Sequence, residues 1–285
     1  MSTNLLRAII NITKSRKYSL AEDYIGKKNL AIVNRANSVG EALELFVKDA
    51  FCGSFDEKEK TKVYSKNFSY LGNQNNPPDI IIRDGDAIEV KKIAGVKKSD
   101  LALNSSYPKS KLLSNSKMIT DACRHCEPGW KEKDIVYSVG FVEGTGLRAI
   151  VFVYGDCYAA SPETYERVRE KFIVGLSKTD MDFSKTNELG RINKVDPLGI
   201  TNLRIRGMWA IQNPLKAFSI LLNVQKENKF TLVALMRKAK YLSFPKEDRD
   251  YIENSKNLKI SDAEIPEPDN PAKLASVKII MFTEK

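Results

Sequence analysis

Asp79, Glu89 and Lys91 are the residues whose types and spacing most readily suggest chemistry in this sequence. They lie in two runs of β-forming residues, 79–83 and 87–91, joined by a short turn, which is typical of a β-hairpin. Carboxylate oxygens are the ligands that Mg²⁺ prefers, and a neighbouring lysine can orient water or stabilise charge that develops on a phosphate. The segment therefore predicts a magnesium site suited to phosphodiester hydrolysis.

The length of the turn decides whether these side chains share one face of the hairpin. A two-residue loop would put Asp79 and Glu89 on opposite faces, whereas a three-residue loop puts them directly across from each other. Gly85 stands at the third position of the longer loop, where a common hairpin turn has a left-handed residue, so we predict that loop. Lys91 then shares the face of the two acids because strand side chains alternate. The opposite, buried face is expected to carry Ile80, Ile82, Ile88 and Val90. The alternative is a solvated hairpin face without a catalytic role.

Positive charge is concentrated in two windows of a chain whose net charge is +10. Residues 91–118 hold seven lysines against one acid, and residues 191–216 hold five basic residues against one acid. Concentrated charge of this kind favours DNA or RNA as a partner, although two solvated basic faces are the alternative. The single histidine, His125, argues against nucleases built on histidine pairs. The sequence has no P-loop motif, so we expect no nucleotide cofactor.

Hydrophobic periodicity predicts a mixed α/β chain. Ser38 with Glu41 forms a capping-box pattern that predicts a helix start, and Gly53 is a plausible stop. The expected helices are 5–12, 38–51 and 162–173; the further expected strands are 134–141, 147–154, 203–211, 230–235 and 278–282, with a proline-rich loop at 264–271.

The chain carries neither a long apolar run nor a signal-peptide pattern, and its four cysteines do not make a disulfide scaffold. We therefore expect no membrane association and a cytoplasmic location. No repeat or linker interrupts the sequence, so one domain is expected.

The sequence Pro78-Asp79 … Glu89-Val90-Lys91 resembles the PD-(D/E)XK nuclease signature. With the segments 38–44, 103–109 and 196–209 in this order, the chain resembles prokaryotic Type II restriction endonucleases, most closely the NgoPII-like group that cuts GGCC. The resemblance extends over about residues 38–213. It implies a restriction-endonuclease-like mixed central sheet flanked by helices, in a single domain over residues 1–285 with N- and C-terminal elaborations.

The resemblance also implies a Mg²⁺-dependent homodimer of a restriction–modification system. Asp79 and Glu89 would be metal ligands with the Val90 carbonyl as a third, and Lys91 would be the catalytic lysine. The family often adds a helical glutamate near the metal. Glu44 points toward the core side of the expected helix and is favoured over Glu41, although a plain edge position of the amphipathic helix is the alternative for Glu44.

Two groups of residues are candidates for DNA contact. Arg204 and Arg206 alternate on one face of an expected strand, where they could read guanine bidentately, contact phosphates or simply be solvated. A loop after the catalytic strand offers hydroxyls and ammonium groups for phosphate contact, or is solvated; its members are Ser105, Ser106, Lys109 and Lys111.

Together these features predict a Type II restriction endonuclease that cleaves double-stranded DNA to 5′-phosphate ends. Two alternatives are open. One is another nuclease of the same superfamily, such as a resolvase or repair nuclease. The other is a non-catalytic nucleic-acid-binding regulator, in which the hairpin acids are structural.

Overall fold

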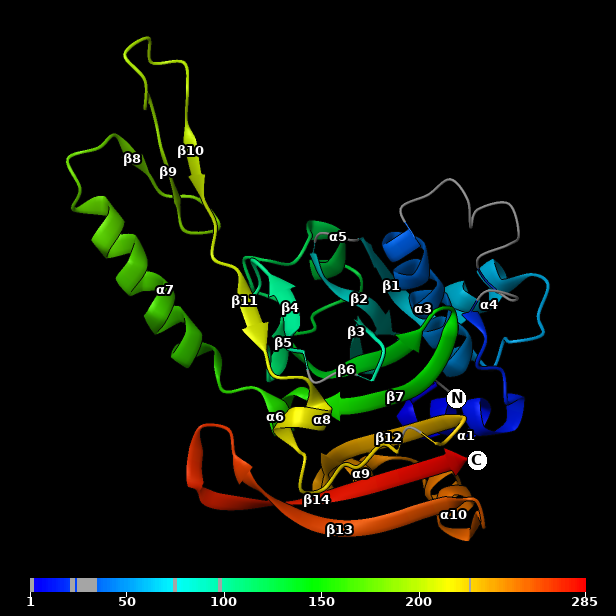
Figure 1. The fold of residues 1–285 in the computed structure, drawn as a ribbon. Coiled ribbons are helices and arrows are strands. Elements are labelled where there is room, and N and C mark those ends of the chain that lie inside the picture. Colours follow the sequence, from blue (N-terminus) through cyan, green and yellow to red (C-terminus); the bar gives the residue numbers. More distant parts are fainter. Residues whose placement is uncertain (1–2, 21–23, 25–34, 74–75, 97–98, 226) are drawn as a thin grey trace.

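A nine-stranded mixed sheet forms the centre of the computed structural model, which describes residues 3–20, 24, 35–73, 76–96, 99–225 and 227–285 (Figure 1). β3 runs parallel to β6, and β12 runs parallel to β7, while the other pairs are antiparallel. The predicted mixed sheet is therefore confirmed. In spatial order the strands are β1 (Phe68–Asn73), β2 (Asn76–Ile82), β3 (Ala87–Ala94), β6 (Glu132–Glu143), β7 (Gly146–Tyr154), β12 (Phe230–Arg237), β14 (Asn270–Glu284) and β13 (Leu258–Glu267), with β5 (Lys111–Leu113) beside β6.

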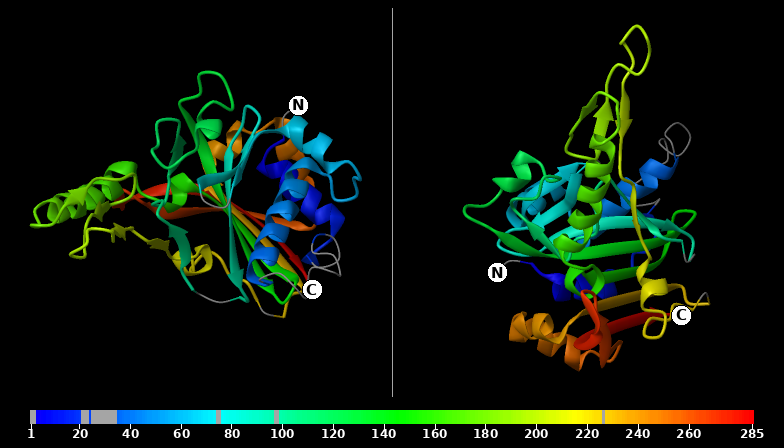
Figure 2. Two further views of the ribbon diagram at one scale, coloured as in Figure 1. Left: turned by 90° about the horizontal axis from the view of Figure 1, so that it is seen from above. Right: turned by 90° about the vertical axis from the view of Figure 1, so that its left-hand side faces the viewer.

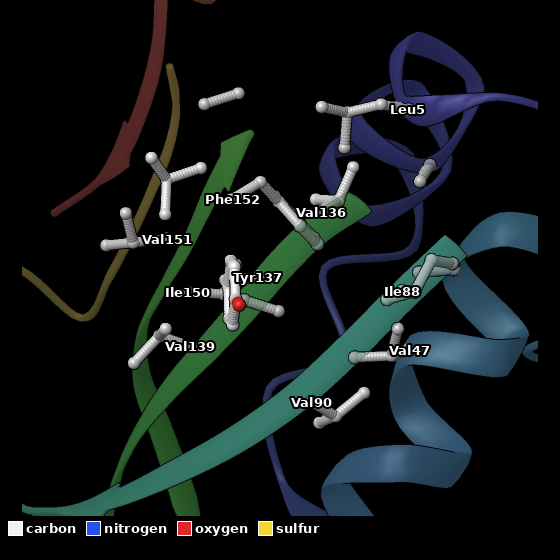
Figure 3. Packing of buried hydrophobic residues seen from close by; sticks show 14 of the residues in the cluster. Leu5, Val47, Ile88, Val90, Val136, Tyr137, Val139, Ile150, Val151 and Phe152 are labelled. Atoms are coloured by element: carbon white, nitrogen blue, oxygen red, sulfur yellow. The ribbon is translucent and has the colours of Figure 1, made fainter. Parts of the chain in front are cut away.

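Helices α1 (Leu5–Ser15) and α3 (Arg35–Cys52) pack on each other, and α3 packs on β3. Figure 3 shows Val47 of α3 beside Ile88 and Val90 of β3, so the apolar face of the hairpin is covered by this helix. Gly140 on β6 permits the close approach of α3, because a Cβ atom there would lie 2.6 Å from the Leu43 methyl groups. This packing brings α3 next to the strand that carries Glu89 and Lys91.

The start of α3 differs from the prediction. The helix begins at Arg35, so Ser38 lies inside it and is not its N-cap. A serine three residues before a glutamate also occurs within helices, and it marks a start only where the preceding backbone is non-helical. The predicted stop is confirmed, because Gly53 follows the last helical residue with a φ of +66°.

The C-terminal part of the chain contains more strand than predicted. The expected loop at 264–271 instead contains the end of β13 and the beginning of β14. β13 lies at the edge of the sheet, where a proline such as Pro266 costs little because one side of the strand needs no partner. The other helices of the main body are α4 (Lys60–Asn67), α5 (Asp121–Arg124), α6 (Gly155–Tyr158), α8 (Pro214–Ala217), α9 (Lys238–Ser243) and α10 (Lys246–Asn254).

An arm built from residues 162–205 extends away from the sheet, as Figures 1 and 2 show. It contains α7 (Pro162–Ser177) and the small antiparallel sheet of β8 (Phe183–Ser184), β9 (Gly190–Ile192) and β10 (Leu203–Ile205). The single strand predicted at 203–211 is wrong. It is divided into β10, which pairs with β9, and β11 (Trp209–Ile211), which pairs with β4 (Leu101–Asn104) near the main body. The chain therefore changes partners at residues 206–208.

None of the helices in the described part of the chain has the length and apolar character needed to cross a membrane.

Candidate active site

The β2–β3 hairpin places the predicted acids opposite each other. Ile80 pairs with Ile88, and the Ile82 amide donates to the Asp86 carbonyl at 2.9 Å, so the connection is the three-residue loop 83–85. Continuing this register by one residue puts Asp79 across from Glu89. The predicted loop length and the buried isoleucine face are both confirmed.

One detail of the turn differs from the prediction. The left-handed residue is Asp84, with a φ of 55°, and not Gly85. Glycine is still required at position 85, because a Cβ atom there would lie 2.9 Å from the Ile82 side chain. Sequence reasoning assigned the positive φ to glycine because glycine adopts it most readily, but aspartate also tolerates this conformation.

Asp79, Glu89 and Lys91 line one polar cavity of about 410 Å³. The Val90 amide donates to Asp79 Oδ2 at 2.6 Å, and Lys91 Nζ lies 2.6 Å from Glu89 Oε1. The other carboxylate oxygen of Glu89, Oε2, is buried and has no hydrogen-bond partner among the described residues. The hairpin thus contains a buried carboxylate oxygen whose hydrogen-bonding capacity is unused among the described residues.

The electrostatics of the cluster favour an added positive charge. Burial, followed by repulsion from Glu89, raises the pKa of Asp79 well above its usual value. Burial alone would lower the pKa of Lys91, but Glu89 and Asp79 outweigh it and raise that pKa. Lys91 is therefore a cation at neutral pH. It compensates only part of the repulsion between the two acids.

The donor set fits a hard divalent cation. Two carboxylates, one with an unpartnered buried oxygen, are the ligands that Mg²⁺ takes while it keeps several waters. Within the described ranges, no three histidine, cysteine, aspartate or glutamate side chains gather as a metal-binding group. The protein would therefore contribute two side chains at this position, and the remaining ligands would be a carbonyl and water.

Glu44 lies on α3, near the cluster but not on the wall of the cavity. Its side chain is half-buried, and burial raises its pKa, while the charges of Lys48 and Lys91 partly offset this effect. Its charge also contributes to the raised pKa of Asp79. The structure thus places Glu44 within electrostatic range of Asp79 and Lys91, and no hydrogen bond joins it to them among the described residues.

The opposite wall of the cavity carries Arg204 and Arg206. Both guanidinium groups contact a residue that sequence reasoning missed, Glu188: Arg204 Nε lies 3.0 Å from Oε2, and Arg206 Nε lies 2.9 Å from Oε1. Ser105 donates to Glu188 Oε1 at 2.8 Å and accepts from Arg206. Glu188 stands in a polar, irregular segment without periodicity, so no local sequence signal marked it.

The loop residues proposed for phosphate contact fall into different environments. Ser106 lines the cavity. Lys109 is 6% exposed and donates to the Ser106 hydroxyl and the Tyr107 carbonyl, and burial lowers its pKa to about 8. Lys111 lies off the cavity wall and pairs with Asp134. The structure therefore brings Ser105 and Ser106 to the cavity surface, but neither Lys109 nor Lys111.

The mixed sheet with flanking helices, and the acidic hairpin beside a basic wall, define a protein with a restriction-endonuclease-like fold. The family model described as NgoPII restriction endonuclease matches residues 3–266. The Type II restriction enzyme NgoPII of Neisseria gonorrhoeae is 42% identical over 283 residues, which cover 98% of this chain and 99% of that protein. The chain belongs to the NgoPII restriction endonuclease family.

The family match is longer than the sequence analysis predicted. In addition to residues 38–213 it includes β12 and nearly all of β13, whereas β14 lies beyond the matched residues. A search of solved structures found no match.

Proposed function

We propose that this chain is a Mg²⁺-dependent Type II restriction endonuclease that cleaves double-stranded DNA within GGCC and leaves 5′-phosphate ends. The observation that carries the proposal is the shared cavity. Its floor holds Asp79, Glu89 and Lys91, and its wall holds Arg204 and Arg206, so groups for hydrolysis and for recognition face the same space. The family membership and the relative named above support the reaction class.

Asp79 and Glu89 would hold the metal ion, with the Val90 carbonyl as a further ligand. When bound, Mg²⁺ supplies a Lewis acid that neutralises charge on the phosphate and lowers the pKa of water. Lys91 remains protonated because the two acids raise its pKa. Its role is to orient the attacking water and to stabilise the negative charge that develops on the phosphate.

Glu44 acts behind this cluster. Its raised pKa and its electrostatic coupling to Lys91 support a role in holding a metal-bound water or a second metal ion. It is a positioning residue here, because the cavity wall does not include it.

Arg204 and Arg206 read the DNA. An arginine pairs bidentately with the O6 and N7 atoms of guanine, so two arginines suit the two guanines of one GGCC half-site. Ser105 and Ser106 contact the backbone from the same cavity. Lys109 supports Ser106 from the buried side, and Lys111 provides a more distant positive charge near the phosphate backbone.

The chain acts as a homodimer in the cytoplasm of a prokaryotic cell. GGCC is palindromic, and a two-fold dimer presents one catalytic hairpin to each strand.

Digestion of a plasmid with mapped GGCC sites tests the proposal. With Mg²⁺ we expect discrete fragments whose sequenced ends all fall at GGCC and carry 5′-phosphates, and with EDTA we expect none. The variant Asp79→Asn should give no fragments. Nicks at branched or damaged DNA would favour a repair-type nuclease instead, and salt-sensitive binding without any Mg²⁺-dependent product would favour a regulator.

A further inference from the structure

Glu188 occupies an unusual position for an acid in a DNA-binding cavity. Its side chain is only 7% exposed, and both of its oxygens are used. Oε2 accepts from Arg204 Nε, while Oε1 accepts from the Ser105 hydroxyl and lies 2.9 Å from Arg206 Nε. These three partners hold the carboxylate ionised, and the pKa of Glu188 is accordingly lowered by Ser105 and Arg204, although burial opposes this.

The backbone of Glu188 is itself fixed by a buried arginine. Arg169 of α7, which is 7% exposed, donates through Nε and Nη2 to the Glu188 carbonyl at 3.1 and 2.7 Å. Nη2 also donates to the Asn187 carbonyl at 2.9 Å. These three hydrogen bonds offset the desolvation cost of the buried guanidinium and attach residues 187–188 to α7.

The contacts with Glu188 leave donors of both reading arginines available. Arg204 meets Glu188 through Nε, and no hydrogen bond of its terminal amino groups occurs among the described residues. Arg206 meets Glu188 through Nε and donates to Ser105 through Nε and Nη2, and no contact of its Nη1 group occurs in the described part of the chain. The two side chains keep 65% and 50% of their surface exposed in the cavity mouth. A guanidinium held at one edge still presents its other donors in a fixed fork, which is the geometry that guanine requires.

We propose that Glu188 is a specificity-determining positioning residue, which aligns Arg204 and Arg206 for base reading and is itself held by Arg169. This inference rests on the proposed function, because it assumes that the two arginines contact bases. A long arginine side chain loses rotamer entropy when it binds a base, and this loss costs free energy. Because Glu188 already orders the two arginines in the free protein, binding to the correct sequence costs less. Glu188 also offsets positive charge, which weakens attraction to correct and incorrect sequences by a similar factor, so its effect on their ratio is expected to come from the alignment of the arginines.

The variant Glu188→Gln tests this role because it removes the charge and keeps the shape. The measurement is the affinity for the duplex that the wild type cuts and for a duplex with one base pair replaced, with Ca²⁺ in place of Mg²⁺ to prevent cleavage. We expect the ratio of the two affinities to fall about fivefold or more, since that is the lower end of the discrimination that one bidentate contact provides. Affinity for the replaced duplex should stay equal or rise, because the variant is more positive by one charge.

Glu163→Gln is the matched control. Glu163 also lies in the arm, on α7, where its side chain is exposed, and no contact with Arg169 or with the reading arginines occurs among the described residues. The same loss of one negative charge there should leave the affinity ratio unchanged. An equal fall in both variants would mean that charge alone matters, and the inference would be overturned.

A second measurement separates alignment from a merely structural role. If Glu188 acts through Arg204, then Glu188→Gln should change discrimination much less in an Arg204→Ala background than in the wild type. Additive effects would overturn the inference, as would a folded Glu188→Gln protein that keeps the wild-type ratio. If Glu188→Gln fails to fold, Glu188→Asp serves instead: its shorter carboxylate cannot keep all three contacts, and the ratio should again fall. A wild type without any sequence preference would refute the proposed function itself, which is a different outcome.

Discussion

Replacement of Lys91 by methionine is the sharpest test of the catalytic cluster, because it removes one charge and keeps most of the side-chain volume. Lys91 Nζ lies 2.6 Å from Glu89 Oε1, and its side chain is 24% exposed at the floor of the cavity. The ammonium group is thus placed to act on the substrate, and it also compensates two acids in the resting protein.

Two magnitudes follow from this position. Loss of a single preorganised electrostatic group slows the chemical step by about 10²–10³-fold, or about 3–4 kcal/mol of the barrier. Removal of the cation also leaves Asp79 and Glu89 facing each other. In the metal-free protein this should cost about 1–3 kcal/mol, less than for a fully buried pair because water reaches Lys91. At about 2–4 °C for each kcal/mol, the fall in Tm is measurable.

The assay combines single-turnover cleavage, duplex binding and thermal unfolding. For Lys91→Met we expect slow cleavage, duplex affinity within a few-fold of the wild type, and a Tm difference from the wild type that narrows when Mg²⁺ is added. Lys92→Met is the control, because Lys92 is the next residue of β3 and does not line the cavity. Cleavage by Lys91→Met at the wild-type rate would refute the role of this lysine.

Three further predictions concern other parts of the structure. Glu44→Gln should slow cleavage about tenfold or more and raise the Mg²⁺ concentration that cleavage requires. Glu41→Gln, on the exposed side of α3, should do neither. Equal effects of the two variants would contradict the role of Glu44. Asp79→Asn should abolish cutting and raise Tm in EDTA at neutral pH. The pKa of Asp79 is raised in the folded state above its usual value of 3.8. Ionisation of Asp79 therefore lowers the stability of the folded protein as the pH rises above 3.8. The Tm gain should therefore disappear at and below that pH, and a gain that persists there would show another cause. A chain that ends at residue 213 should not fold, because it lacks β12 and β14, which complete the central sheet beside β7. A cooperative unfolding transition of that fragment would contradict the expected single domain.

The hairpin shows how much of a site local sequence can predict. Its loop length and register followed from alternation and from the three residues between the strands, and the structure confirms both. These features depend on neighbouring residues only. The same reasoning misplaced the positive φ at Gly85, because conformational preference alone does not say which turn residue packs under Ile82.

The basic wall shows what local reasoning cannot supply. Arg204 and Arg206 line the same cavity, although Arg206 lies beyond the end of β10 and not on the single strand that was expected. Glu188 reaches them from the loop before β9, and Ser105 reaches them from a distant part of the chain. Contacts between segments so far apart leave no periodic signal in either segment. For the same reason Lys109 was expected on the surface, although tertiary packing buries it.

The proline-rich stretch at 264–271 gave a wrong indication of the fold. The expected loop at 264–271 is occupied by two strand ends, because β13 is an edge strand and its neighbour β14 supplies partners along its length. The position of a strand at the edge of a sheet depends on how the whole sheet assembles, so the local sequence does not predict it.

We propose that Asp79 and Glu89 together bind one divalent cation beside the phosphate to be cleaved. Anomalous diffraction from crystals of the Lys91→Met variant with its target duplex and Mn²⁺ shows directly where that cation lies. We expect a manganese peak bonded to both carboxylates and to an oxygen of the DNA backbone. A peak that contacts only one of the two acids, or that lies elsewhere on the protein, would contradict it.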